Sequence, residues 1–209
     1  MAKCLKVKVT FIEELLGTAS GDPEIHSEFI ASKAPDAPSL TEEVKAIGVD
    51  GVIEKSKTIF PRLDGKPFLW DYQVKGFLKD SCGALARVSG TESSKVKAYK
   101  KILDGTVFVY PRKIMLNFDG EIGNCQRPLR AQTAQGERIA LANSETCPEG
   151  TTAEFIVEVL EDKHVPLICE LLDYSKRRGY GQWRNSGKGR AISEVVEISD
   201  GMYEGGDCE

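Results

Sequence analysis

The sequence predicts an α+β fold, and three observations support it. Residues 5–11 alternate apolar and polar side chains, as a half-buried strand does. Residues 72–88 carry apolar or small side chains at spacings of three and four, as a helix with one buried side does. The order strand, glycine-bearing segment, helix and strand is found near both ends of the chain. Two such units sharing one sheet predict a ferredoxin-like fold with an inserted middle.

The other elements follow from the same kind of pattern. Two more helices and three extended segments are expected: helices 93–105 and 162–179, and extended segments 106–118, 153–161 and 190–198. Gly105 and Gly179 stand at the ends of these two helices, where a left-handed cap favours glycine. Pro166 suits the first turn of the second helix.

Two segments interrupt this frame. Residues from about 17 to about 60 are expected to be an insertion with two helices, broken at the two prolines of residues 33–39. Residues from about 120 to about 150 are expected to form a protruding β-hairpin that turns at Gln135–Gly136. The whole is expected to be one domain over residues 1–198, followed by an acidic flexible tail at 199–209.

Composition narrows the class of protein. The chain of 209 residues is 41% hydrophobic and has no apolar run of 18 residues, so a location in the cytoplasm is expected. Its six cysteines form no Cys-x-x-Cys pair, and only two histidines could join them as ligands. Buried thiols in a reducing compartment are therefore expected, with no metal site and no cofactor.

The net charge of −4 hides an uneven distribution. Residues 13–54 hold ten acids and two bases, whereas residues 55–190 hold 23 bases and 16 acids. The chain after Arg190 has six acids and no base. An acidic average with a basic middle is compatible with a localised anion-binding face, and scattered solvated charge is the alternative.

One stretch concentrates glycine and positive charge. Residues 177–190, "RRGYGQWRNSGKGR", contain four glycines, five bases and one tryptophan. Glycine lets a backbone approach a ligand closely, and successive free N–H groups in such a turn bind anions. Trp183 could stack on a nucleobase or on a guanidinium. A structural glycine hairpin is the competing interpretation.

The order of these motifs resembles a known family. A strand, a helix, the glycine-rich stretch and a final strand resemble the C-terminal part of the RAMP superfamily, the RNA-binding subunits of CRISPR systems. Residues 65–85, "GKPFLWDYQVKGFLKDSCGAL", resemble its strand-to-helix segment, with Lys75-Gly76 matching the family's Lys-Gly. The glycine-containing loop "LLGTASGD", residues 15–22, is a third match. Within this superfamily, the sequence most resembles the backbone subunits that polymerise along guide RNA. One interpretation is that the chain is a phage-encoded member.

The resemblance implies an RRM-like RAMP fold that binds single-stranded nucleic acid, preferably RNA, without catalysis. It also implies that copies of the chain associate along the strand, and that a CRISPR or other host-defence complex is a partner. No membrane is expected as a partner. Residues 70–73 replace the small residues that the family has before its Lys-Gly, so backbone contacts there are expected to differ. The expected nucleic-acid-binding residues are Lys75, Lys79, Arg127, Arg130, Arg138, Arg177, Arg178, Gly179, Gly181, Trp183, Arg184, Gly187, Lys188, Gly189 and Arg190.

Two other functions fit less of the sequence. One is a phage factor that docks on, or mimics, a CRISPR subunit and so inhibits host defence. The other is a RAMP-type endoribonuclease, with His26 as general base or Asp22 as a metal-dependent cleaving residue. An ordinary surface or helix-start histidine is the better interpretation of His26, since no histidine, tyrosine or lysine partner is identifiable. An Asp-Pro turn explains Asp22 as well as a catalytic role does. No catalytic residue is therefore assigned, and enzyme activity is not expected.

Overall fold

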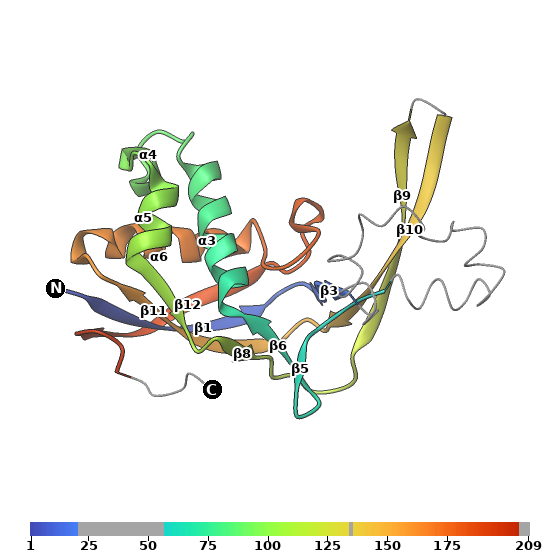
Figure 1. The fold of residues 1–209 in the computed structure, drawn as a ribbon, viewed down its shortest axis with the longest axis horizontal. Coiled ribbons are helices and arrows are strands. Elements are labelled where there is room, and N and C mark those ends of the chain that lie inside the picture. Colours follow the sequence, from blue (N-terminus) through green and yellow to red (C-terminus); the bar gives the residue numbers. More distant parts are fainter. Residues whose placement is uncertain (21–56, 134–135, 205–209) are drawn as a thin grey trace, which may run out of the picture.

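The computed structural model describes residues 1–20, 57–133 and 136–204, and its centre is a four-stranded antiparallel sheet (Figure 1). The strands are β1 (Lys3–Phe11), β7 (Val107–Tyr110), β11 (Thr152–Val159) and β12 (Ala191–Asp200). They lie in the order β12-β1-β11-β7. Helices lie between β1 and β7 and between β11 and β12, so these four strands follow the βαββαβ path. The predicted α+β, ferredoxin-like fold is confirmed.

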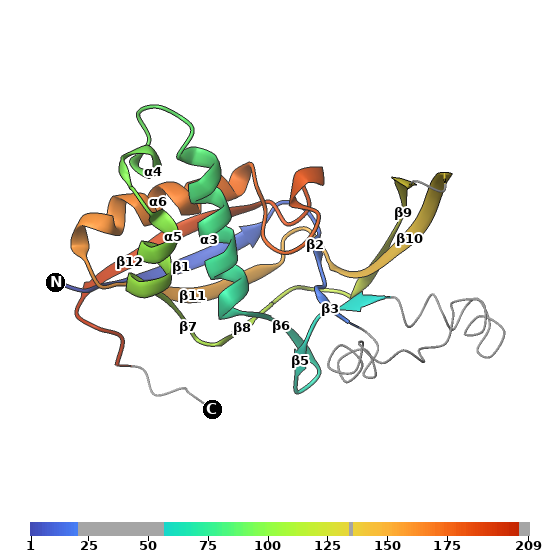
Figure 2. The ribbon, with the colours of Figure 1, turned by 45° about the horizontal axis from the view of Figure 1, so that its top comes forward.

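The helices cover one face of this sheet and leave the other open (Figures 1 and 2). They are α3 (Asp71–Leu85), α4 (Glu92–Lys95), α5 (Tyr99–Thr106) and α6 (Val165–Asp173). The central strand β1 shows the cause. Val7 and Val9 are buried under the helices, whereas Lys6 and Lys8 are exposed on the open face. The alternation predicted from the sequence therefore sets which face the helices cover.

Helix α3 carries the predicted apolar stripe. Its buried residues are Val74, Phe77, Leu78, Ser81 and Cys82. The glycines of this helix differ in their surroundings. A Cβ at Gly83 would lie 2.7 Å from the Tyr99 hydroxyl, so a larger residue there would displace the end of this side chain of α5. A Cβ at Gly76 would meet nothing within 4 Å, so packing does not explain that glycine.

The helix expected over residues 93–105 is two short helices instead. Helix α4 ends at Lys95, the chain passes through Ala98 at a φ of +54°, and α5 begins at Tyr99. Helix α5 continues through Gly105 to Thr106, and Gly105 is not among the glycines with positive φ. The expected left-handed cap at Gly105 is wrong, because strand β7 follows the helix without an intervening turn.

The helix expected over residues 162–179 is also divided. A 3₁₀ turn at Asp162–His164 precedes α6, and a second one follows at Tyr174–Lys176. Gly179 is not a left-handed cap, since its φ is not positive. A Cβ at Gly179 would lie closer than 3.0 Å to the backbone of Gly189, so the crossing of two chain segments is what requires glycine here.

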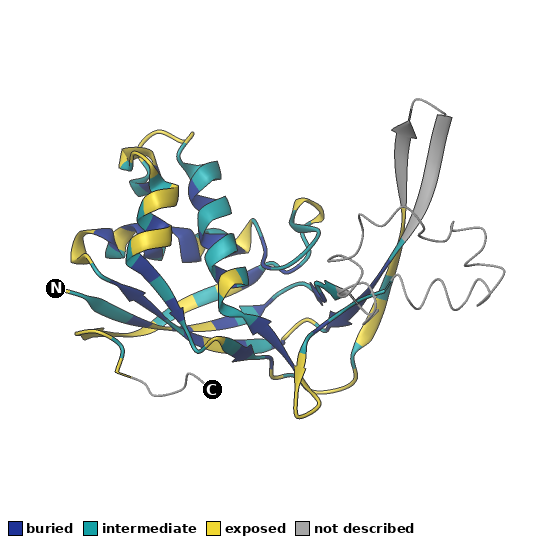
Figure 3. Ribbon diagram, in the orientation of Figure 1, coloured by how far each residue is buried: buried dark blue, intermediate teal, exposed yellow. Residues whose placement is uncertain are grey.

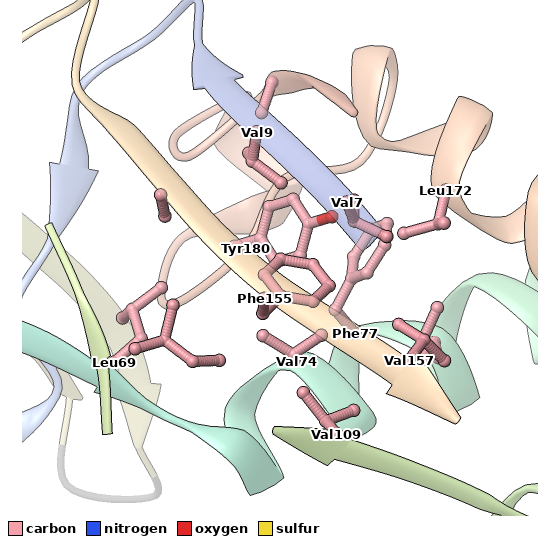
Figure 4. Close-up of a cluster of buried hydrophobic side chains, with 14 of the residues drawn as sticks. Val7, Val9, Leu69, Val74, Phe77, Val109, Phe155, Val157, Leu172 and Tyr180 are labelled. Atoms are coloured by element: carbon pink, nitrogen blue, oxygen red, sulfur yellow. The ribbon is translucent and has the colours of Figure 1, made fainter. Parts of the chain in front are cut away.

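Residues 177–190, called the glycine loop below, are anchored in the core by Tyr180. This side chain is 2% exposed and lies among the core side chains (Figure 4). Its ring centroid is 4.1 Å from that of Phe77 and 5.8 Å from that of Phe11. Its hydroxyl is 2.9 Å from the hydroxyl of Ser193, and burial raises the pKa of Tyr180. The loop is therefore part of the hydrophobic core on one side.

The long hairpin projects from the domain as predicted (Figures 1 and 3). It consists of β9 (Gly123–Thr133) and β10 (Gly136–Cys147). The remaining strands are β2 (Leu15–Leu16), β3 (Ala19–Ser20), β4 (Thr58–Ile59), β5 (Arg62–Leu63), β6 (Lys66–Trp70) and β8 (Lys113–Met115). β2 and β4 pair with the base of β10. The two helices expected in the insertion fall on residues 21–56, outside the described residues.

A buried carboxylate fixes the base of the hairpin. Glu145 of β10 is 8% exposed and accepts hydrogen bonds from Arg62 Nη2 at 2.8 and 2.9 Å. It also accepts one from the Phe60 backbone N–H at 3.0 Å. Because each oxygen of the carboxylate has a donor, these hydrogen bonds offset its desolvation, and the hairpin is tied to β5.

The C-terminal strand runs further than residue 198. Strand β12 pairs with β1 up to Asp200, and the chain then crosses toward β7. The Tyr203 ring stacks on Tyr110 at 4.6 Å between centroids, and its N–H donates to Glu158. The start of the tail expected to be flexible therefore packs on the open face, and residues 205–209 lie outside the described residues.

Strand β12 is also an edge of the sheet. It exposes Ile192, Val196 and Ile198. A register shift opposite Lys6 and Val7 places one extra residue in it, which is a β-bulge.

The close approach of the backbone at Gly179 and Gly189 predicts that Gly→Ala substitutions will change the stability of the fold by unequal amounts. Gly179→Ala should lower the free energy of unfolding by roughly 3 kcal/mol or more, because backbone atoms must move apart. Gly187→Ala, at a φ of +82° with only the Arg190 side chain within 4 Å, should cost about 1 kcal/mol. Gly105→Ala, inside α5 with nothing within 4 Å, should add about 0.5–1 kcal/mol. Urea denaturation of the three variants measures this order, and equal stabilities would contradict it.

Candidate nucleic-acid interface

The glycine loop folds back on itself and on the segment after β1. The Tyr180 N–H donates to the Gly189 carbonyl at 2.8 Å, which closes the loop. The Gly189 N–H in turn donates to the Glu14 carbonyl at 2.8 Å. A Cβ at Gly189 would lie closer than 3.0 Å to the Tyr180 carbonyl oxygen. Gly179 and Gly189 therefore have a structural role, which is the hairpin interpretation of the pattern.

Four of the five bases of the loop have carboxylate partners. Lys188 contacts Glu14 at 2.7 Å, and this hydrogen bond raises the pKa of Lys188. Arg190 contacts Glu13 at 2.8 Å. The two acids at the start of the acidic segment 13–54 are thus paired within the chain, and Lys188 and Arg190 fasten the loop to it.

The other two paired bases share one acid. Asp80 of α3 accepts from Arg178 Nε, and Arg184 Nη1 lies 3.2 Å from the same carboxylate. The hydrogen bond to Asp80 raises the pKa of Arg178. Asp80 therefore holds two guanidinium groups side by side. Arg177, the fifth base, is exposed, with no carboxylate partner in the described part of the chain.

A groove of about 560 Å³ opens between the glycine loop and the hairpin; we call it the loop groove. Its lining residues come from the hairpin base and from the loop: Arg127, Arg178, Gly181, Gln182, Trp183, Arg184, Asn185 and Ser186. None of them is acidic. Arg127 lies over the Trp183 ring, with its guanidinium carbon 5.4 Å from the ring centroid. Three guanidinium groups and one indole thus face a single open depression.

The backbone adds donors to the loop groove. Within the described chain, the N–H groups of residues 181–185 donate no hydrogen bond, although the N–H groups of Ser186, Gly187 and Lys188 bond back into the loop. Gly181 and Trp183 have positive φ, at +73° and +52°. Successive N–H groups in such turns form concave anion sites. Residues 181–185 therefore have the unbonded N–H groups that the prediction of an anion-binding turn requires.

Trp183 is held in a conformation that few tryptophans adopt. Its φ of +52° and ψ of +32° are left-handed, which costs roughly 1–3 kcal/mol for a residue other than glycine. Its carbonyl accepts the N–H of Ser186 at 2.8 Å, and Arg127 covers its ring. The surrounding contacts therefore fix an indole at the groove against a local preference.

The lysines of α3 point toward α5. Lys75 donates to the Asp104 carbonyl at 3.0 Å and lies 4.9 Å from the Phe108 ring centroid, and its burial lowers its pKa. Lys79 contacts the Asp104 carboxylate at 2.8 Å. Lys79 lines a second groove together with Arg178. The structure thus connects Lys79 with the glycine loop and leaves Lys75 at the α5 side.

The hairpin arginines are spread along its length. Arg127 is exposed near the base, at the loop groove. The backbone of Arg130 pairs with Ile139, and that of Arg138 pairs with Ala131, farther along the hairpin. Of these three, Arg127 is the one whose described side chain lines the loop groove.

The weak catalytic candidates, His26 and Asp22, lie outside the described residues. Within residues 1–20, 57–133 and 136–204, no three His, Cys, Asp or Glu side chains gather as a metal site would need. In the same ranges no helix is long and apolar enough to cross a membrane. Cys82 and Cys147 are buried, and burial raises the pKa of Cys147 to about 12.

Sequence reasoning missed the partners of the bases. Glu13, Glu14 and Asp80 each neutralise bases of the glycine loop. Only Glu13 and Glu14 had a signal, since they directly follow β1, to which the last strand pairs. Tyr180 was also missed, although an aromatic residue between two glycines indicates a side chain inserted where the backbone is closely packed.

Comparisons with known proteins add little to this geometry. No family model matches the chain, and no curated protein matches it. Among solved structures, a chain of the "Cryo-EM structure of the Type III-B Cmr-beta bound to cognate target RNA" matches with a TM-score of 0.46 and 12% identity. The match covers 95% of this chain and 60% of that chain.

The shared carboxylate predicts a measurable coupling. Asp80→Asn should lower the free energy of unfolding by about 1 kcal/mol, because two guanidinium groups lose their partner. Asp104→Asn is the matched control and should cost less, since it releases Lys79 alone from a more exposed carboxylate. Urea denaturation at low and high salt measures both, and the difference should shrink as salt screens the pairs. Equal losses in the two variants would contradict the role of Asp80.

Proposed function

We propose that this chain is a non-catalytic protein that binds single-stranded nucleic acid, with RNA preferred, in the manner of a RAMP-type subunit. The loop groove carries the proposal. It combines Arg127, Arg178 and Arg184 with the indole of Trp183 and the N–H groups of residues 181–185. No acid lines it. Guanidinium and amide donors together match the oxygens of a phosphate backbone.

Asp80 supports this role by orienting the two loop arginines. It contacts both guanidinium groups from α3 and is not part of the groove lining. A guanidinium has five N–H donors, so contact with one carboxylate leaves donors for a phosphate. Side chains fixed in advance lose less entropy when the ligand binds. The salt bridges therefore reduce the net positive charge but make the arginines rigid.

Trp183 favours a single strand over a duplex. Its ring lines the loop groove beside three arginines, and the contacts with Arg127 and Ser186 hold it there although its backbone is left-handed. An aromatic face stacks on an unpaired nucleobase, whereas the bases of a duplex are already stacked on one another. An indole that lies beside phosphate-binding groups is therefore suited to a single strand, whose unpaired nucleobases can stack on it.

The open face of the sheet is less suited to a polyanion. Glu154, Glu194 and Glu197 are exposed on it beside Lys6 and Lys8. Tyr203 also covers Tyr110 there. Binding is therefore assigned to the glycine loop and not to the sheet. The preference for RNA and the relation to CRISPR backbone subunits come from the motif resemblance alone.

Two kinds of substitution should separate phosphate contacts from base stacking. Arg127→Gln with Arg184→Gln should weaken binding to a short single strand and reduce the slope of log K against log salt by about 1.4, since each phosphate contact contributes about 0.7. Trp183→Ala should cost about 1–3 kcal/mol of binding and leave that slope unchanged. Fluorescence anisotropy across a salt series measures both quantities.

The matched control replaces two lysines on the open face of the sheet. Lys6→Gln with Lys8→Gln removes the same charge from the open face. This variant should keep the slope of the unmodified protein. If it loses as much slope as the arginine variant, binding follows overall charge and the loop groove is not the site.

A further inference from the structure

A second basic groove begins where the loop groove ends. Residues of α3, α5 and the glycine loop line an open depression of about 610 Å³; we call it the helix groove. Its bases are Lys79, Arg87, Lys100 and Arg178, and its acids are Asp80 and Asp104. Arg178 lines both grooves, so the two depressions adjoin at this residue.

The acids of the helix groove are already paired. Asp104 contacts Lys79, and Asp80 contacts Arg178. Within the described chain, Arg87 and Lys100 have no carboxylate partner, and both are exposed. The unbalanced charge of the groove is therefore at Arg87 and Lys100.

The shape of the groove follows from the helix. Asp80, Gly83, Ala84 and Arg87 recur at spacings of three and four, so they lie along one side of α3 and its end. Gly83 and Ala84 form a low floor between the charged ends. The Tyr99 hydroxyl lies against Gly83 and makes no hydrogen bond within the described residues, which leaves it able to donate to an anion.

From this continuity we infer that the helix groove is a second phosphate-binding site, which holds the part of a single strand that extends beyond the glycine loop. The inference rests on the proposed function and adds to it a path: Arg127, the glycine loop, Arg178, then Arg87 and Lys100. Arg178 is the junction, because it contributes to both grooves. Two basic side chains without a carboxylate partner, a hydroxyl without a hydrogen bond and an open floor suit the successive phosphates of a strand better than a compact ligand.

The test compares strands of two lengths. Single-stranded RNA of about 4 nucleotides should fill the loop groove alone, whereas about 12 nucleotides should reach both grooves. The variant combines Arg87→Gln with Lys100→Gln, so that both unpaired bases of the helix groove are removed together. It should bind the long strand several-fold more weakly, with a salt slope reduced by about 1.4, and bind the short strand normally.

A matched control lies in the same segment. Lys97 and Lys101 are exposed and do not line the helix groove. Lys97→Gln with Lys101→Gln should leave binding of both strand lengths unchanged. If the groove variant keeps the full salt slope on the long strand, or if the control loses as much, the inference is wrong.

Failure of this inference is distinguishable from failure of the proposed function. The variant with Arg127→Gln and Arg184→Gln should weaken both strand lengths. If it weakens neither, the proposed function fails. If it weakens both while the groove variant weakens neither, only the helix groove is excluded. If the groove variant instead abolishes self-association of the free protein, measured by light scattering, the groove binds an acidic segment of a second copy and the phosphate site is overturned.

Discussion

The burial of Tyr180 is the constraint on which the candidate site depends. This side chain is a core residue in contact with Phe77 of α3 and Phe11 of β1, yet it belongs to the most basic loop of the chain. Its insertion brings the backbone of residues 179–181 close to the core. The end of the loop then has to cross this backbone closely, at Gly189. The half of the loop that lines the loop groove, residues 181–186, is therefore held on a fixed base. A loop without such an anchor would not hold an indole in a left-handed conformation.

Electrostatic pairing around the loop has two separate effects. Glu13 and Glu14 fasten its returning arm to the end of β1, whereas Asp80 aligns two arginines at the grooves. The ion pairs of Glu13 and Glu14 stabilise the fold, whereas those of Asp80 orient the arginines that line the grooves. A count of basic residues does not separate these roles, because it gives equal weight to a lysine that secures a turn and to an arginine that faces a depression. The three-dimensional positions of the acids make the difference.

The sequence was sufficient for the fold and only partly sufficient for the site. The alternation in β1 and the spacing in α3 reflect burial on one face, which is a local property of each element, and both were correctly predicted. The glycine spacing indicated close approach but not which atoms approach, because Gly179 and Gly189 meet each other through a crossing that spans ten residues. Gly105 was misjudged as a cap because a glycine inside a helix and a glycine after it give the same signal. Arg178 and Asp80 are 98 residues apart, and no local pattern links them.

The form of β12 has a consequence for behaviour at high concentration. This ten-residue strand ends the sheet and exposes three large aliphatic side chains, so it offers backbone groups and apolar surface to any other extended chain. Its bulge interrupts a flat ladder, and Glu197 would face Glu197 of a second β12 that pairs antiparallel about this residue. Like charges directly opposite destabilise strand pairs. The edge is therefore protected against aggregation with identical copies, while an extended segment rich in lysine would meet no such barrier.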